Sequence, residues 1–222
     1  MDRGRGVCAG LVPHHALYGM SPDSYRTVTC SAEGTLRERA SKFIGIIFPI
    51  ANEEDFKQNL QRIVIEHPNA RHFCFAYIIG EEGAYQRSSD AGEPSGTAGP
   101  PILRAIQGAQ LTFTGVVVVR YFGGTLLGKG GLVQAYGDAS RAAIANATIV
   151  ERIVMAHIRF SCSFALFEIM KRELAAVGGD MIEKHFDEGC SGIARVPKTR
   201  SVELTDHWRG MNISAQLVDQ TK

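Results

Sequence analysis

A glycine-rich stretch that follows a strongly apolar segment has the residue types of a phosphate-binding loop. Gly123 and Gly128, followed by Lys129, satisfy the first seven positions of the G-x-x-x-x-G-K-[ST] motif. The eighth position is Gly130, so the hydroxyl that would hold Mg²⁺ is missing. This argues against nucleotide hydrolysis of that type, but glycines before a helix can still direct backbone N–H groups at an anion. The alternative is that the glycines only allow a tight chain reversal.

An acidic loop over residues 88–101, rich in Gly, Pro and Ser, is the second candidate. It contains Asp90 and Glu93, two carboxylates three residues apart, which could bind a divalent metal or act as acid and base. In a turn-rich segment such carboxylates more often accept hydrogen bonds from backbone N–H groups. We favour this structural role, because Pro94 and the nearby glycines make the loop demanding on its backbone.

Cationic side chains stand beside both loops. Arg120 and Lys129 bracket the glycine-rich stretch and are the candidates for contacts with a ligand phosphate, with solvated surface charge as the alternative. Arg71 and His72 precede a predicted strand, and Cys74 two residues further on suggests half of a metal site. Residues two apart on a strand share a face simply because of the strand's periodicity, so the spacing of His72 and Cys74 is no evidence of a metal site by itself. No second pair of His and Cys residues with matching spacing occurs elsewhere in the sequence. The sequence therefore predicts neither a metal nor a cofactor, and it contains no G-x-S-x-G motif of a serine hydrolase.

Composition places the chain among ordinary globular proteins. Of its 222 residues, 45% are apolar and 21% are charged, and the formal net charge is +1. Any contact with nucleic acid must therefore come from a local patch. The five cysteines are scattered and form no C-x-x-C pair, unlike a secreted disulfide framework. No apolar run approaches the roughly 18 residues of a membrane span, and we expect a cytoplasmic protein.

The apolar pattern divides the chain near Val150. Residues 1–23 show no period and are expected to be a disordered or non-native extension. The segment 24–150 is predicted to contain strands at 25–30, 42–49, 71–79 and 115–121, and helices between 52 and 68, at 102–108 and at 132–147. Together these predict one α/β module with its own core.

A second module is predicted at 151–222. Its expected strands are 153–161, 181–186, 191–196 and 211–218, with helices between 164 and 178 and near 198–208. The order β-α-β-β-α-β is typical of a ferredoxin-like fold. We therefore predict an α+β protein with two separate cores, and pairing of the 116–121 strand with the 153–161 strand would contradict this.

Two long motifs resemble the signature of the IMPACT/YigZ family. They are SDAGEPSGTAG at 89–99 and VVRYFGGTLLGKGGLVQAY at 118–136, and ARHFC at 70–74 also fits. The resemblance runs from about residue 24 to the C-terminus. It implies that 24–150 has the domain-2-like fold of the small-subunit ribosomal protein numbered five. It also implies that 151–222 is ferredoxin-like and similar to the last domain of elongation factor G.

The resemblance also implies a function. Eukaryotic relatives regulate translation, and the surface shared by the two glycine-rich loops is taken as a site for nucleic acid or another anion. We therefore predict a non-enzymatic, translation-associated protein that binds RNA, a ribosome-associated factor or another anionic ligand. The alternatives are a protein–protein adaptor and an enzyme for a small phosphorylated or peptide-like substrate with Asp90 or Glu93 as base. The predicted binding residues are Arg71, His72, Asp90, Glu93, Thr97, Arg120, Gly123, Gly124, Gly128, Lys129 and Gly130.

Overall fold

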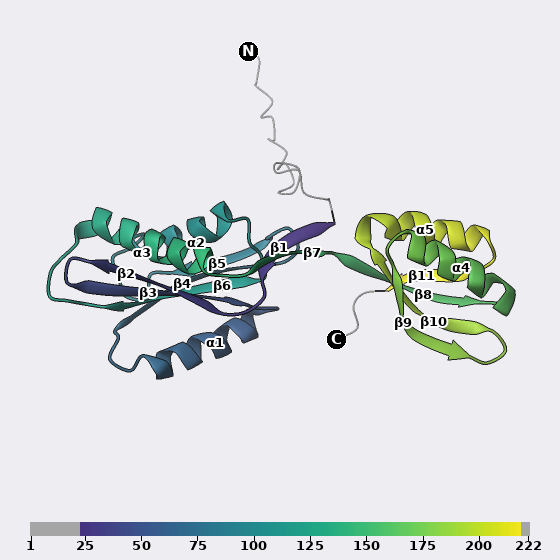
Figure 1. The fold of residues 1–222 in the computed structure, drawn as a ribbon, viewed down its shortest axis with the longest axis horizontal. Helices are drawn as coiled ribbons and strands as arrows, with labels where there is room; N and C mark the ends of the chain where they lie inside the picture. The colour runs from purple at the N-terminus through teal and green to yellow at the C-terminus, as the bar shows by residue number, and fades with distance from the viewer. Residues whose placement is uncertain (1–22, 219–222) are drawn as a thin grey trace, which may run out of the picture. The chain divides into compact units, whose positions relative to one another are not determined.

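The computed structural model describes residues 23–218, which fold as two compact units (Figure 1). The first unit holds Tyr25–Arg152, and the second holds 153–218 together with Asp23 and Ser24. Strand β6 (Thr114–Tyr121) lies in one sheet and β8 (Met155–Cys162) lies in another. The pairing that would have merged the two predicted cores does not occur, and the α+β, two-domain fold is confirmed. The likeness of the first unit to the ribosomal-protein domain stays a prediction.

The first unit is built on a five-stranded antiparallel sheet. In spatial order its strands are β2 (Ala32–Glu38), β3 (Ser41–Pro49), β6, β4 (His72–Ile79) and β5 (Tyr85–Ser89). The central strand β6 is buried along almost its whole length, as expected for a run of four valines between two neighbours. A separate two-stranded sheet pairs β1 (Ser24–Val28) with β7 (Ile149–Ile153).

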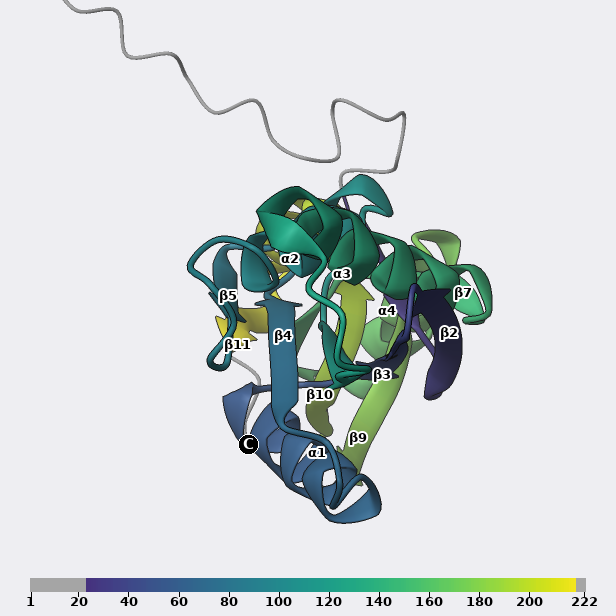
Figure 2. The same ribbon diagram turned by 90° about the vertical axis from the view of Figure 1, so that its left-hand side faces the viewer.

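Helices cover both faces of this sheet, α1 (Glu53–Glu66) on one face and α2 (Gly99–Gly108) with α3 (Gly128–Ala145) on the other (Figures 1 and 2). Helix α1 begins where predicted, because the Asn52 side chain accepts a hydrogen bond from the Asp55 backbone N–H at 2.9 Å. Phe56 and Ile63, two turns apart, are its buried residues. Each face therefore has its own apolar core.

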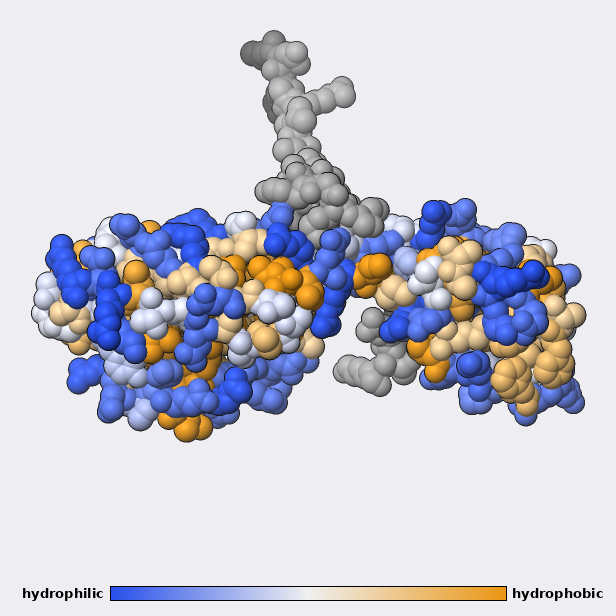
Figure 3. Space-filling model, in the orientation of Figure 1, coloured by the Kyte–Doolittle hydropathy of each residue, from blue (hydrophilic) through white to orange (hydrophobic). Residues whose placement is uncertain are grey.

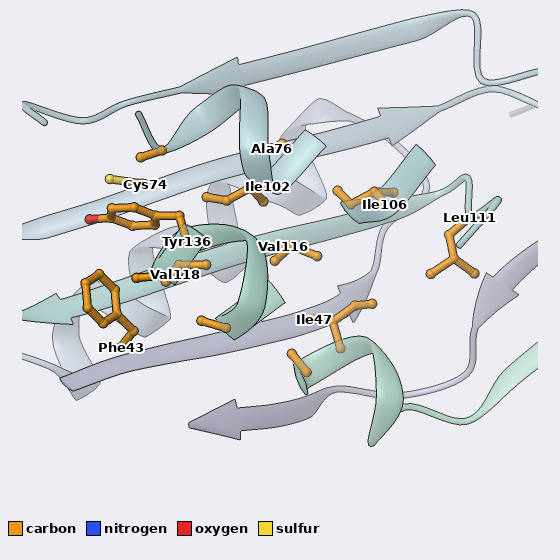
Figure 4. Close-up of a cluster of buried hydrophobic side chains, with 14 of the residues drawn as sticks. Phe43, Ile47, Cys74, Ala76, Ile102, Ile106, Leu111, Val116, Val118 and Tyr136 are labelled. Carbon is orange, nitrogen blue, oxygen red and sulfur yellow. The ribbon is translucent and has the colours of Figure 1, made fainter. Parts of the chain in front are cut away.

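The α3 face is packed very closely. Gly34 and Gly45 are direct cross-strand partners, and a Cβ at Gly45 would lie 2.3 Å from the Ala139 carbonyl oxygen of α3. These two glycines let the helix approach the backbone of β2 and β3. Figure 4 shows the core on this face, in which the rings of Phe43 and Tyr136 meet edge to face with centroids 5.2 Å apart.

Several element boundaries differ from the prediction. The edge strand β2 was not predicted because its sequence is largely polar, and β5 begins before and runs into the predicted acidic loop. Helices α2 and α3 begin three and four residues earlier than predicted, so the glycines of the second loop form the first turn of α3. The predicted strand at 153–161 is interrupted at Val154, between the end of β7 and the start of β8.

The predicted N-terminal extension, residues 1–23, lies outside the described residues except for Asp23. This residue is buried, and its carboxylate accepts a hydrogen bond from the Thr199 backbone N–H at 2.7 Å.

The second unit has the predicted β-α-β-β-α-β order. Its antiparallel sheet contains, in spatial order, β11 (Ser214–Val218), β8, β10 (Cys190–Pro197) and β9 (Asp180–Phe186). Helices α4 (Phe164–Ala176) and α5 (Lys198–Gly210) cover one face of this sheet (Figure 1). Phe160, Met170 and the fully buried Trp208 lie in the core between the two layers.

The surface is mixed in character. On the face drawn in Figure 3, hydrophilic residues predominate and apolar residues appear in small groups between them. Within residues 23–218, no helix is long and apolar enough to cross a membrane.

Candidate anion-binding site at the two glycine-rich loops

Asp90 organises the acidic loop. Its carboxylate accepts backbone hydrogen bonds from Gly96 at 2.9 Å, Ala98 at 2.8 Å and Gly99 at 2.9 Å. Because Ala98 and Gly99 stand at the start of α2, Asp90 caps that helix from eight and nine residues upstream. Burial by itself would raise the pKa of Asp90, but the three hydrogen bonds outweigh it and hold the pKa below its ordinary value. These hydrogen bonds are of the kind that the predicted structural role of this carboxylate requires.

Asp90→Asn is expected to lower the free energy of unfolding by about 2 kcal/mol, because the amide keeps one acceptor oxygen and turns an NH₂ group toward N–H donors. Since the folded-state pKa is lowered, the contribution of Asp90 is complete above the ordinary aspartate pKa of about 3.9. It is lost as the pH falls through the lower folded-state pKa. Urea titrations of both proteins at several pH values measure this difference, with the exposed Ser95→Ala as control. A difference independent of pH would contradict the assignment.

Glu93 points inward and is paired with two side chains. Its Oε1 accepts a hydrogen bond from Arg120 Nη1 at 2.6 Å and another from the Tyr136 hydroxyl at 2.8 Å. The side chains of Glu93 and Arg120 are only 4% and 6% exposed. The guanidinium also lies over the rings of Phe43 and Phe122, 5.5 Å and 5.2 Å from their centroids. This buried cluster joins the acidic loop to β6 and α3.

The buried cluster bears on two predicted roles. Arg120, predicted to contact a ligand phosphate, is instead neutralised by Glu93 inside the protein. Asp90 and Glu93, the alternative catalytic bases, both have their carboxylates engaged by internal donors. The geometry therefore favours a structural role for all three charged groups.

His72 and Cys74 hold the acidic loop against the sheet. His72 Nδ1 lies 3.2 Å from the Ala91 carbonyl oxygen, and the Cys74 thiol donates to the Asp90 carbonyl oxygen at 2.9 Å. Burial raises the pKa of the Cys74 thiol to about 12, so it is a poor nucleophile and a poor metal ligand. Figure 4 shows this thiol beside the ring of Tyr136.

Thr97 and Arg71 differ in their surroundings. Thr97 is 2% exposed and its hydroxyl donates to the Pro94 carbonyl oxygen at 2.6 Å, which stabilises the turn. Arg71 is exposed and stands directly before β4.

Among residues 23–218, no group of three or more His, Cys, Asp or Glu side chains could hold a metal ion.

The glycine-rich loop between β6 and α3 is exposed and fixed at its first glycine. A Cβ at Gly123 would lie 1.9 Å from the Ala40 carbonyl oxygen in the turn between β2 and β3. Gly124 and Gly128 adopt positive φ angles of 87° and 73°, which glycine tolerates best. Apart from each glycine's own chain neighbours and helix backbone, no described residue lies within 4 Å of a Cβ built at Gly124, Gly128 or Gly130. The start of α3 therefore faces open space.

Within residues 23–218, no side-chain hydrogen bond caps the N-terminus of α3. Leu127 at the N-cap makes no side-chain hydrogen bond, and the first turn contains no acidic residue but does contain the exposed Lys129. A second cation, Arg39, donates from Nη1 to the Leu126 carbonyl oxygen at 2.8 Å. Sequence reasoning missed Arg39, because only the β2–β3 turn brings it to this loop. The first N–H groups of a helix have no partner within the helix, and together with these cations they can bind an anion.

Comparison with known proteins supports the family that the two motifs indicate. Residues 39–144, which contain both loops, match the family model of the Impact N-terminal domain. The IMPACT family member YvyE of Bacillus subtilis strain 168 is 36% identical over 165 residues, covering 74% of this chain and 76% of the relative. The IMPACT family member YigZ of Escherichia coli K12 is 32% identical over 178 residues, covering 78% and 87%.

A solved structure shows the same fold over most of the chain. It is a crystal structure described as that of a hypothetical protein, with 28% sequence identity and a TM-score of 0.63. The match covers 90% of this chain and 99% of that one, so it includes both units. With two relatives above 30% identity matched over most of their own lengths, the chain belongs to the IMPACT family.

Proposed function

We propose that this IMPACT-family protein is a translation-associated, cytoplasmic RNA-binding protein whose first unit binds phosphate groups at the N-terminus of α3. The observation that carries the proposal is the uncapped and exposed start of this helix. In the same unit, Asn52 and three acidic residues stand at the start of α1, and Asp90 caps α2. Helix α3 instead presents Lys129, which the helix dipole disfavours unless an anion is bound there.

Side chains around the loop support a nucleic acid as the ligand. Arg39 and Lys129 supply a local positive charge that the overall charge of +1 does not. Phe122, which follows β6, is 52% exposed, and an exposed ring can stack on a base of single-stranded RNA. The association with translation is proposed from the family resemblance and from the phosphate-binding geometry taken together.

Gly128→Val should lower the affinity for a single-stranded RNA oligonucleotide at least tenfold, because a branched residue disfavours the positive φ of 73° that orients the first turn of α3. Lys129→Ala should weaken binding about threefold and lower the slope of log K against log salt by about 1. Fluorescence anisotropy at 50 and 200 mM salt would measure both effects.

The matched control is Gly108→Ala at the end of α2, where a Cβ meets nothing within 4 Å. It should bind like the wild type. Inorganic phosphate and a double-stranded RNA serve as competitors, and competition by phosphate alone would indicate a small anion as the ligand. If all the folded variants bound RNA with equal affinity, the glycine-rich loop would be only a structural turn and the proposal would be wrong.

A further inference from the structure

Two cysteines of the second unit lie directly opposite each other on neighbouring strands. β10 runs antiparallel to β8, and the register pairs Cys190 with Cys162. Direct cross-strand partners have Cα atoms about 4.5 or about 5.5 Å apart, which is within the range of disulfides. Their side chains point to the same face of the sheet, and both belong to the core beneath the helices.

Both residues are free thiols, 8% and 1% exposed for Cys162 and Cys190. Burial, and next the charge that a Cys190 thiolate would carry nearby, raise the pKa of the Cys162 thiol. The pair lies at one end of the sheet, because Cys162 is the last residue of β8 and Cys190 is the first residue of β10. Strand ends open more readily than strand centres, which gives a reagent access to a buried pair.

The backbone around the pair is closely packed. A Cβ at Gly189 would lie 2.7 Å from the Cys162 carbonyl oxygen, so the turn between β9 and β10 closes directly against the end of β8. This contact holds the two cysteine backbones in register. The described part of the second unit contains no other cysteine.

We propose that Cys162 and Cys190 form a reversible cross-strand disulfide by exchange with a low-molecular-weight disulfide such as oxidised glutathione. When the end of β8 opens to water, the more exposed Cys162 loses its proton and its thiolate attacks one glutathione sulfur, which forms a mixed disulfide and releases one glutathione thiolate. The Cys190 thiolate then attacks the sulfur of Cys162 and releases the second glutathione. The two protons lost by the protein thiols go to the two glutathione thiolates. Two protein thiols are oxidised and one disulfide is reduced to two thiols.

The disulfide would fasten the end of β8 to the start of β10. Since Ser163 and Phe164 follow Cys162 directly and begin α4, the link also restrains the start of this helix. Oxidation should therefore stabilise the second unit against unfolding by restricting its unfolded state. Trp208, the single tryptophan of the chain and a core residue of this unit, reports that unfolding by its fluorescence.

The test treats the folded wild-type chain with excess oxidised glutathione, traps remaining thiols with N-ethylmaleimide and maps cysteines by peptide mass spectrometry. We expect a peptide containing Cys162 linked to one containing Cys190, while the exposed Cys30 carries glutathione and shows that the oxidant is active. The midpoint of thermal unfolding followed by Trp208 fluorescence should rise by at least about 5 °C and return after reduction with dithiothreitol.

Cys190→Ser is the matched variant, since it removes the resolving thiol and should show neither the link nor the rise. The proposal is overturned if both wild-type thiols are trapped by N-ethylmaleimide while Cys30 is oxidised. It is equally overturned if Cys162 stops at a glutathione adduct, or if the link forms only after unfolding in urea.

Discussion

Glu93→Ala is expected to lower the free energy of unfolding by about 4 kcal/mol, because it leaves a buried guanidinium without its counter-ion. Arg120 is 6% exposed and its Nη1 donates to Glu93 at 2.6 Å. Its Nε has no hydrogen-bond partner among the described residues, so loss of the carboxylate leaves most of the charge uncompensated. The Tyr136 hydroxyl loses its acceptor as well. Urea unfolding followed by circular dichroism would measure the loss.

A double-mutant cycle separates the ion pair from packing. Arg120→Met should also destabilise the protein, since it leaves the Glu93 carboxylate, which is 4% exposed, without its counter-ion. The double variant should be at least about 2 kcal/mol more stable than the sum of the two single effects predicts. Strictly additive effects would show that the pair is not coupled.

An exposed ion pair of similar length provides the control. Arg87 Nη1 lies 2.8 Å from Glu53 Oε1, but the Arg87 side chain is 57% exposed. Arg87→Ala should therefore destabilise the protein far less than Glu93→Ala does. Burial, and not the N–O distance, is expected to decide the difference between the two pairs.

Gly123→Ala is expected to destabilise the first unit by about 3 kcal/mol, because the added Cβ would collide with backbone. The Cβ would lie 1.9 Å from the Ala40 carbonyl oxygen and 2.2 Å from its carbon. Neither atom belongs to a flexible side chain, so β6 or the β2–β3 turn must move. The same displacement would shift Arg39 away from Leu126, to which it is hydrogen-bonded.

Gly130→Ala in the first turn of α3 is the matched control. A Cβ there meets nothing within 4 Å, and its φ is not positive. Alanine favours the helix over glycine by up to about 1 kcal/mol, so stability should be unchanged or slightly higher. Chemical denaturation of both variants tests the contrast, and equal stabilities would mean that Gly123 is not a point of close approach.

Local periodicity was sufficient to predict much of the fold. Asn52 and the acids after it mark the start of α1, and the valine run of β6 marks a central strand. The β-α-β-β-α-β order of the second unit likewise follows from alternating patterns along the chain. These signals lie between neighbours a few residues apart, where helix and strand geometry alone determines which side chains share a face.

Residue types also identified the two loops, but not what each charged group does. That Asp90 caps α2, and that Glu93 forms a buried ion pair with Arg120, depends on how the acidic loop folds over β6. A carboxylate three residues from another looks alike in sequence whether it faces solvent or an arginine.

The sequence by itself determined the family, the two modules and the glycine-rich loops. Only the tertiary structure decided that Arg39 joins the start of α3, and that Cys162 meets Cys190 across two strands. Both pairs of partners are far apart in the chain: Arg39 reaches Leu126 from the turn between β2 and β3, whereas the two cysteines meet through the register of β8 and β10. A shift of one residue in that register would turn one cysteine to the other face of the sheet, so the register is set by the packing of the whole unit.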